Sequence, residues 1–234
     1  MLGSIHNCIA VDVYRLCVEK LDGITVYRRY AEGSTATERH LIDVEIVELV
    51  PMYPVYIPKF ITQYILCILD KELVVAPGKS VKVYLSIPID YAVYARSGQS
   101  FAMIDVFTLD RRPKYILYGP TDHGVVARLC RVSVSFTPIK PGLGYAVSMV
   151  IVRNSTKDIV KVKRILLDAS PLRLFYVPGT WRVYTQKIVM NIDSQSTATV
   201  IYSEPFISNA VAIDDPPDLR PPKICNRTDM LWGF

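Results

Sequence analysis

Hydrophobic and polar residues alternate with a period of two along most of the chain. This is the pattern of a β-strand that buries one face. In the clearest case, residues 130–137, Cys130, Val132, Val134 and Phe136 alternate with polar residues. No window of about 15 residues carries the 3.6-residue period of an amphipathic helix. The sequence therefore predicts an all-β protein.

Residues that favour turns separate the predicted strands. Asp22-Gly23 predicts a tight hairpin between strands at 11–18 and 24–30. Pro77-Gly78 predicts a turn before the alternating strand 81–87. The nearly continuous apolar run 145–152 is typical of a central strand that is covered on both faces.

Short strands separated by such turns indicate β-sandwiches. We expect two immunoglobulin-like β-sandwich domains, at residues 1–120 and 121–215, with one larger β-sandwich as the alternative. Residues 216–234 are expected to form a tail outside both domains.

The tail has a stiff part followed by an apolar end. Prolines at 216, 217, 221 and 222 predict an extended, semi-rigid segment. Leu231, Trp232 and Phe234 follow near the terminus and need burial. Two hypotheses stay open: the tail folds back onto its own domain, or these three residues dock on a neighbouring subunit.

Composition narrows the class of protein. Half of the 234 residues are hydrophobic, but the most apolar long stretch, 46–69, contains Glu48, Lys59 and three prolines, which argues against a membrane span. The first residues lack the basic region of a signal peptide, so we expect a cytoplasmic protein. Scarce glutamine beside plentiful Ile, Val, Tyr and Arg favours a thermophilic source.

The five cysteines, Cys8, Cys17, Cys67, Cys130 and Cys225, form no CxxC pair, which argues against a zinc site. Cys67 and Cys130 lie in apolar strands and are predicted to be buried free thiols. The odd count argues against a disulfide framework, although hyperthermophiles do use intracellular disulfides. We predict no metal and no cofactor, and the pairing of the cysteines stays open.

No motif for a catalytic nucleophile or a phosphate-binding loop is present, so no catalytic residue is assigned. The densest conjunction of strand, aromatic and cationic residues is 101–136. Its ligand-binding candidates are Asp105, Lys114, Tyr115, Tyr118, His123 and Arg128.

Basic and aromatic residues also interleave, which is a pattern that can bind a nucleic-acid backbone and stack bases. The net charge of +5 is modest, and a solvated sheet face is the simpler interpretation. The clusters are Tyr27–Tyr30, Arg111–Tyr115, and the set Arg128, Arg131, Lys161, Lys163 and Arg164.

The phrases IDVFTL and KYILYGP, preceded by VPMYPVYIP and PGKSVKVYLSIPIDYAVY, resemble an archaeal family of uncharacterised proteins, domain of unknown function 432. The resemblance covers residues 27–215 and leaves out the tail, residues 216–234. It implies an archaeal source and no particular activity.

The function class that these observations favour is a non-enzymatic binding or assembly module that self-associates or docks a protein partner. The high apolar fraction and the tail motivate this hypothesis. A nucleic-acid-associated protein is one alternative. An enzyme with a site near Lys114–His123 is the other.

Overall fold

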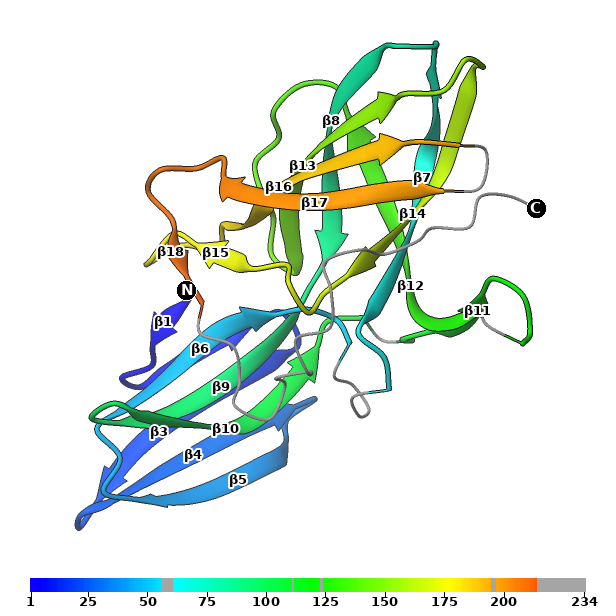
Figure 1. The fold of residues 1–234 in the computed structure, drawn as a ribbon. Coiled ribbons are helices and arrows are strands. Elements are labelled where there is room, and N and C mark those ends of the chain that lie inside the picture. Colours follow the sequence, from blue (N-terminus) through cyan, green and yellow to red (C-terminus); the bar gives the residue numbers. More distant parts are fainter. Residues whose placement is uncertain (56–60, 111, 123, 195–196, 214–234) are drawn as a thin grey trace.

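The computed structural model describes residues 1–213 except 56–60, 111, 123 and 195–196. Within these residues every regular element is a β-strand, from β1 to β18, and the strands form three sheets (Figure 1). The all-β prediction is confirmed. No helix in the described part of the chain is long and apolar enough to cross a membrane.

The first sheet is an antiparallel meander near the N-terminus. Asp22, with φ 42°, and Gly23, with φ 82°, form the turn between β3 and β4, as two-residue hairpins of this hand require. The hairpin predicted at this position is confirmed. The order is β2 (Cys8–Val11), β3 (Tyr14–Leu21), β4 (Ile24–Ala31) and β5 (Ser34–Ile42).

The second sheet packs against the first and has the order β1 (Gly3–Ser4), β6 (Ile46–Met52), β9 (Asp90–Ser97) and β10 (Ser100–Thr108). Tyr14 of β3 meets Phe107 of β10 edge to face, with ring centroids 4.9 Å apart. Val93 and Leu16 are both fully buried in the core. The inner face of the second sheet is therefore one wall of a two-layer core.

The third sheet has ten strands and contains two parallel pairs, β7 with β12 and β13 with β16. As predicted from its apolar run, β13 is central, between β8 and β16. The strands are β7 (Tyr64–Val75), β8 (Ser80–Pro88), β11 (Tyr115–Tyr118), β12 (Val125–Ser135), β13 (Tyr145–Asn154), β14 (Val160–Asp168), β15 (Leu174–Tyr176), β16 (Val183–Ile192), β17 (Ala198–Pro205) and β18 (Val211–Ala212).

Strand pairing does not follow the domain boundary expected at residue 120. Strands β7 and β8 precede this residue, yet they pair with β12 and β13, which follow it. A division at residue 120 therefore separates hydrogen-bonded strands. The chain instead passes from the third sheet to the second at Ile89, between β8 and β9.

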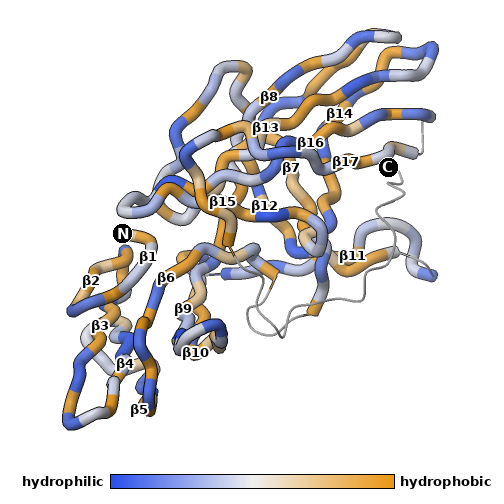
Figure 2. Tube along the Cα trace, turned by 60° about the vertical axis from the view of Figure 1, so that its left-hand side comes forward, coloured by the Kyte–Doolittle hydropathy of each residue, from blue (hydrophilic) through white to orange (hydrophobic). Residues whose placement is uncertain are grey.

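The first and second sheets form one body and the third sheet forms the other, and hydrophobic and hydrophilic residues interchange along the strands of both (Figure 2). One continuous core cluster includes side chains from all three sheets. Tyr91 of β9 helps to join the bodies, since its ring meets Trp181 at 6.2 Å and its hydroxyl accepts a hydrogen bond of 2.8 Å from the Gly144 amide. The two bodies therefore share packing at this junction.

The cysteines follow two different patterns. Cys67 and Cys130 are buried free thiols, as predicted, and lie opposite each other on β7 and β12. Cys8 and Cys17 form a disulfide between β2 and β3. The argument from an odd cysteine count is wrong for this pair, because the hairpin places the two residues opposite each other.

We expect the double variant Cys8→Ser/Cys17→Ser to lose about 2–3 kcal/mol of stability, because the crosslink closes a short loop in the unfolded chain. Urea unfolding at neutral pH measures the loss. Wild-type protein in reductant is the control and should unfold with the variant. Equal midpoints for wild type with and without reductant would contradict the prediction.

Candidate binding face

The second sheet buries both of its faces, although only one of them packs on the first sheet. We call the opposite side the outer face. In β9 the residues with the parity of Tyr91 point inward and those with the parity of Ala92 point outward. Ala92 and Tyr94 of the outward set are as deeply buried as Tyr91 and Val93 of the inward set, so the middle of β9 is covered on both sides.

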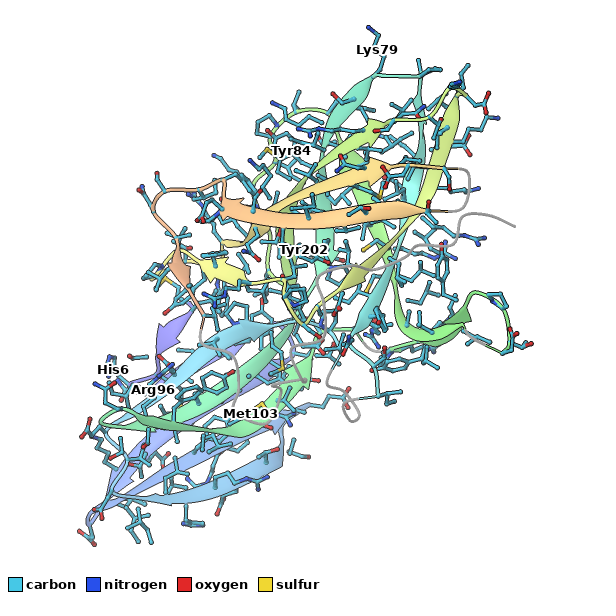
Figure 3. The ribbon with its side chains drawn as sticks, in the orientation of Figure 1. His6, Lys79, Tyr84, Arg96, Met103 and Tyr202 are labelled. Atoms are coloured by element: carbon cyan, nitrogen blue, oxygen red, sulfur yellow. A yellow bond between two sulfur atoms is a disulfide. The ribbon has the colours of Figure 1, made fainter. Side chains whose placement is uncertain are left out.

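Residues of the outer face form a separate hydrophobic cluster. Val50, Met52, Ala92 and Tyr94 are 0–5 % exposed. Phe101, Met103 and Val106 of β10 are partly buried against them. Figure 3 labels Met103 and Arg96 on this sheet. In a simple two-layer sandwich, the outer face of a sheet would be exposed to solvent.

Ile213 reaches this cluster from outside the sheet. It follows β18 and is the last residue before the tail that the structure describes. Its amide donates a hydrogen bond of 3.1 Å to the Leu174 carbonyl, and its side chain packs against the outer face. The chain therefore enters its C-terminal segment at this face.

A cation–aromatic group closes one end of the outer face. The Arg96 guanidinium lies 4.6 Å from the Phe101 ring centroid and 5.9 Å from that of Tyr94. Glu48 pairs with the same guanidinium. Arg96 therefore covers aromatic surface while its charge is balanced.

The other end of the outer face is a buried polar cluster. Asp90 begins β9 with the outward parity of Ala92, and its side chain is almost fully buried. Arg128 of β12, which is 1 % exposed, donates to Asp110 at 2.8 Å. Its guanidinium lies 5.5 Å from the ring of Tyr115, the residue opposite it in the ladder. This cluster joins the second and third sheets.

Several polar atoms of this cluster lack a partner. Both carboxylate oxygens of Asp90 and the Nε and Nη1 atoms of Arg128 are buried without a hydrogen-bond partner among the described residues. Burial raises the pKa of Asp90 to about 7, and Asp110 acts in the same direction. The Thr108 side chain and the charge of Arg128 act in the opposite direction. Burial dominates because the charged form loses its hydration.

The structure brings together Tyr115 and Arg128 of the predicted ligand-binding set. Asp105 lies elsewhere, between the two layers, where it accepts hydrogen bonds from Arg29 at 2.7 Å and Tyr27 at 2.8 Å. The structure therefore does not bring Asp105 together with Tyr115 and Arg128, because its side chain points to Arg29 and Tyr27 of the first sheet.

Lys114 and Tyr118 lie at the two ends of β11. The Lys114 carbonyl accepts a hydrogen bond of 2.9 Å from the Leu129 amide. Burial raises the pKa of Tyr118, while the charge of Arg164 lowers it. His123, Leu231, Trp232 and Phe234 lie outside the described residues.

Sequence reasoning missed Asp90 and Asp110. Asp90 is a lone carboxylate in the apolar run IPIDYAVYA, and this isolation was a usable signal. A charge inside a strand that is covered on both faces is costly unless something compensates it. Asp110 gave no such signal, since it lies in a polar turn.

The two arginines of the first basic cluster, Arg28 and Arg29, are paired with carboxylates. Arg28 bridges Glu19 at 2.9 Å and Glu38 at 2.7 Å. Arg29 binds Asp105 between the layers. These pairings neutralise the first cluster and reduce its attraction for phosphates.

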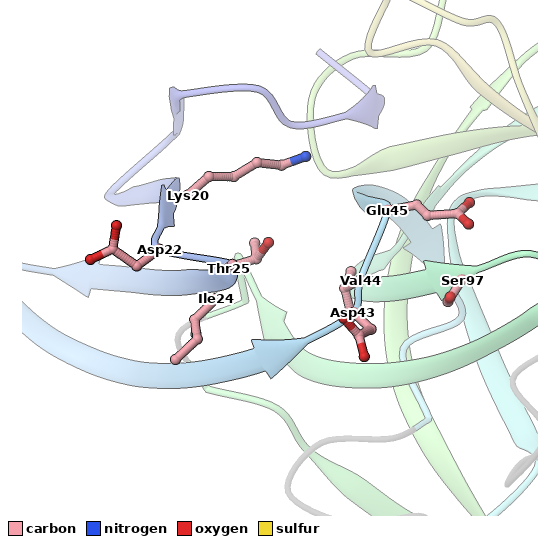
Figure 4. Close-up of a pocket in the computed structure, with 9 residues that line it drawn as sticks. Lys20, Asp22, Ile24, Thr25, Asp43, Val44, Glu45 and Ser97 are labelled. Carbon is pink, nitrogen blue, oxygen red and sulfur yellow. The ribbon is translucent and has the colours of Figure 1, made fainter.

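An open pocket of about 590 Å³ lies where β3 and β5 end and β4 begins, and Figure 4 shows its lining. Asp22, Asp43 and Glu45 contribute carboxylates, and Lys20 and Ser97 complete the polar wall. Within the described ranges no group of three His, Cys, Asp or Glu side chains is placed to hold a metal ion. The pocket offers mixed charges and little apolar contact.

A comparison with protein families gives one result. The family model described as "Protein of unknown function (DUF432)" matches residues 2–229. No curated protein matches the chain, and no solved structure matches it.

Proposed function

The chain belongs to the DUF432 family, as its resemblance predicted, and we propose that it is a non-enzymatic assembly module. The outer face is its binding surface, and the occupant is the C-terminal segment 214–234, which is exchanged between two copies. The pair of molecules is then a symmetric dimer in which each copy donates its segment to the other.

The burial of the outer face carries this proposal. Four of its side chains are 0–5 % exposed, although the first sheet packs on the opposite side. Ile213 packs on the face, and the segment that begins one residue later ends in Leu231, Trp232 and Phe234. A face that is buried without a sheet packed on it and a segment that needs burial therefore meet at Ile213.

The prolines of the segment favour its docking on the other copy over its folding back onto its own copy. An extended proline-rich stretch advances about 3.1 Å per residue, so a spacer of seven such residues spans about 20 Å. Such a spacer carries the apolar terminus away from its origin. Exchange costs little contact energy, because the segment makes the same contacts on either copy.

We also propose that two β-sandwich units, immunoglobulin-like as the sequence suggests, make up the chain, with strands β7 and β8 assigned to the second unit. The pairing of β7 and β8 with β12 and β13 supports this assignment. The face then belongs to the first unit and Arg128 to the second.

A nucleic-acid-associated function is the weaker candidate, because Arg28, Arg29 and Arg128 of its basic clusters are paired with carboxylates. It predicts salt-dependent binding of an oligonucleotide to the full chain at low ionic strength. Absence of such binding would remove it.

Light scattering on the size-exclusion eluate tests the assembly proposal with full-length variants. Met103→Asp on the face and Trp232→Asp in the segment are each expected to raise the dimer dissociation constant by about 100-fold. The reason is that an unpaired carboxylate is costly to bury. Wild type should elute with twice the mass of one chain.

Ile201→Asp is the matched control. Ile201 is 48 % exposed on β17, so the same chemical change should leave the mass unaltered. A wild type that stays monomeric at every concentration would overturn the exchange proposal, as would a dimer that survives both test variants.

A further inference from the structure

The buried polar end of the outer face suggests which part of the bound segment it recognises. Asp90 starts β9 in the second sheet, and Arg128 lies in β12 of the third (Figure 1). Both side chains are 1 % exposed. Asp90 lies opposite Thr108 in the β9–β10 ladder, and Asp110, two residues after Thr108, accepts a hydrogen bond of 2.8 Å from Arg128. Asp90 and Arg128 therefore lie near each other where the second and third sheets meet.

These neighbours offer complementary and unused hydrogen-bonding groups. The Asp90 carboxylate presents two acceptors, and Arg128 presents donors at Nε and Nη1, all without a hydrogen-bond partner in the part of the chain that the structure describes. One further Arg128 donor already binds Asp110 at 2.8 Å. Buried polar groups without partners are costly, so this end of the face favours a guest that satisfies both sets.

The charges restrict the chemistry of that guest. An anion would meet the carboxylates of Asp90 and Asp110, and a metal cation would meet the guanidinium of Arg128. A neutral group that both donates and accepts fits both partners. The peptide unit is such a group, since every non-proline residue carries one N–H donor and one carbonyl acceptor.

Resting on the proposed function above, we propose that Asp90 and Arg128 clamp the main chain of the docked C-terminal segment. Asp90 accepts a hydrogen bond from a peptide N–H of the segment, and Arg128 donates to a peptide carbonyl. The apolar floor formed by Met52, Ala92 and Tyr94 takes the side chains. The face thereby selects an extended apolar peptide by its backbone as well as by its side chains.

Hydrogen exchange on the full-length protein tests the clamp. We expect Arg128→Met, which keeps the length and loses the donors, to lower amide protection across residues 214–234 by about tenfold or more. Protection of β13 (Tyr145–Asn154) should be unchanged. Asp90→Asn, which keeps one acceptor oxygen, should have a smaller effect on the same residues, and it decides the question if Arg128→Met does not fold.

The alternative guest is an internal water molecule that bridges Asp90 and Arg128. In that case Arg128→Met lowers protection in β9 and β12 and leaves residues 214–234 unchanged, which would overturn the clamp. Met103→Asp separates this failure from failure of the proposed function. If it releases the segment and Arg128→Met does not, only the clamp is wrong; if neither releases it, the docking proposal is wrong.

Discussion

Replacing Asp105 by alanine is expected to destabilise the protein by about 3–5 kcal/mol, because it leaves a buried arginine without its counter-charge. The Asp105 side chain is 6 % exposed and that of Arg29 is 14 % exposed. Two bonds, of 2.7 and 3.2 Å, join them, and the Tyr27 hydroxyl donates to the same carboxylate at 2.8 Å. The Val106 amide donates to this carboxylate as well, at 2.9 Å, so the variant removes the acceptor of four donors at once.

The surroundings of Arg29 leave it little freedom to escape. Its guanidinium lies 5.2 Å from the Tyr14 ring centroid and 5.4 Å from that of Phe107, between the two layers. Moving it to water would open this packing. Urea unfolding monitored by circular dichroism measures the loss of stability.

Glu38→Ala is the matched control for Asp105→Ala. Glu38 also accepts a bond from an arginine, Arg28, at 2.7 Å, but its side chain is 40 % exposed. Exposed pairs contribute little because water and salt screen them. An equal loss of stability in both variants would show that burial of the Asp105 pair does not matter.

The second large effect is a pH dependence centred on Asp90. Burial raises the pKa of this carboxyl to about 7 in the folded protein, whereas an unfolded aspartate titrates at about 3.9. Between these values the folded state holds a proton that the unfolded state has released. The contribution of the neutral carboxyl to stability is therefore complete below about pH 4 and is lost as the pH rises through 7.

A shift of about three pKa units corresponds to a loss of up to about 4 kcal/mol. We expect Asp90→Asn to remove this component, so that the variant becomes more stable than wild type as the pH rises from 4 to 8. Denaturant unfolding at several pH values measures the difference. The groups that interact with Asp90 are Arg128, Asp110, Thr108, Tyr115 and Cys130.

Asp110→Asn serves as the control for this titration. Asp110 binds the same arginine at 2.8 Å, but its side chain is 42 % exposed. Its variant should keep most of the pH dependence of the wild type. A difference between Asp90→Asn and wild type that stays constant from pH 4 to 8 would contradict the assignment to Asp90.

Features that depend on neighbours along the chain are the ones that the sequence determined by itself. Alternation with a period of two predicted strands throughout, and Asp22-Gly23 predicted a hairpin that the structure contains. The apolar run at 145–152 predicted a central strand, and β13 is one. The outcomes agree because side-chain alternation and turn conformation are short-range properties.

Only the tertiary structure decided which distant strands pair and which charges become buried. The parallel pairing of β7 with β12 joins segments on both sides of the expected boundary at residue 120. The registers of β9 and β10 turn Asp105 towards Arg29 and carry Asp90 to Arg128. The free energy of a charged carboxylate depends on its exposure to water and on its neighbours in space. The local pattern of residues determines neither of these.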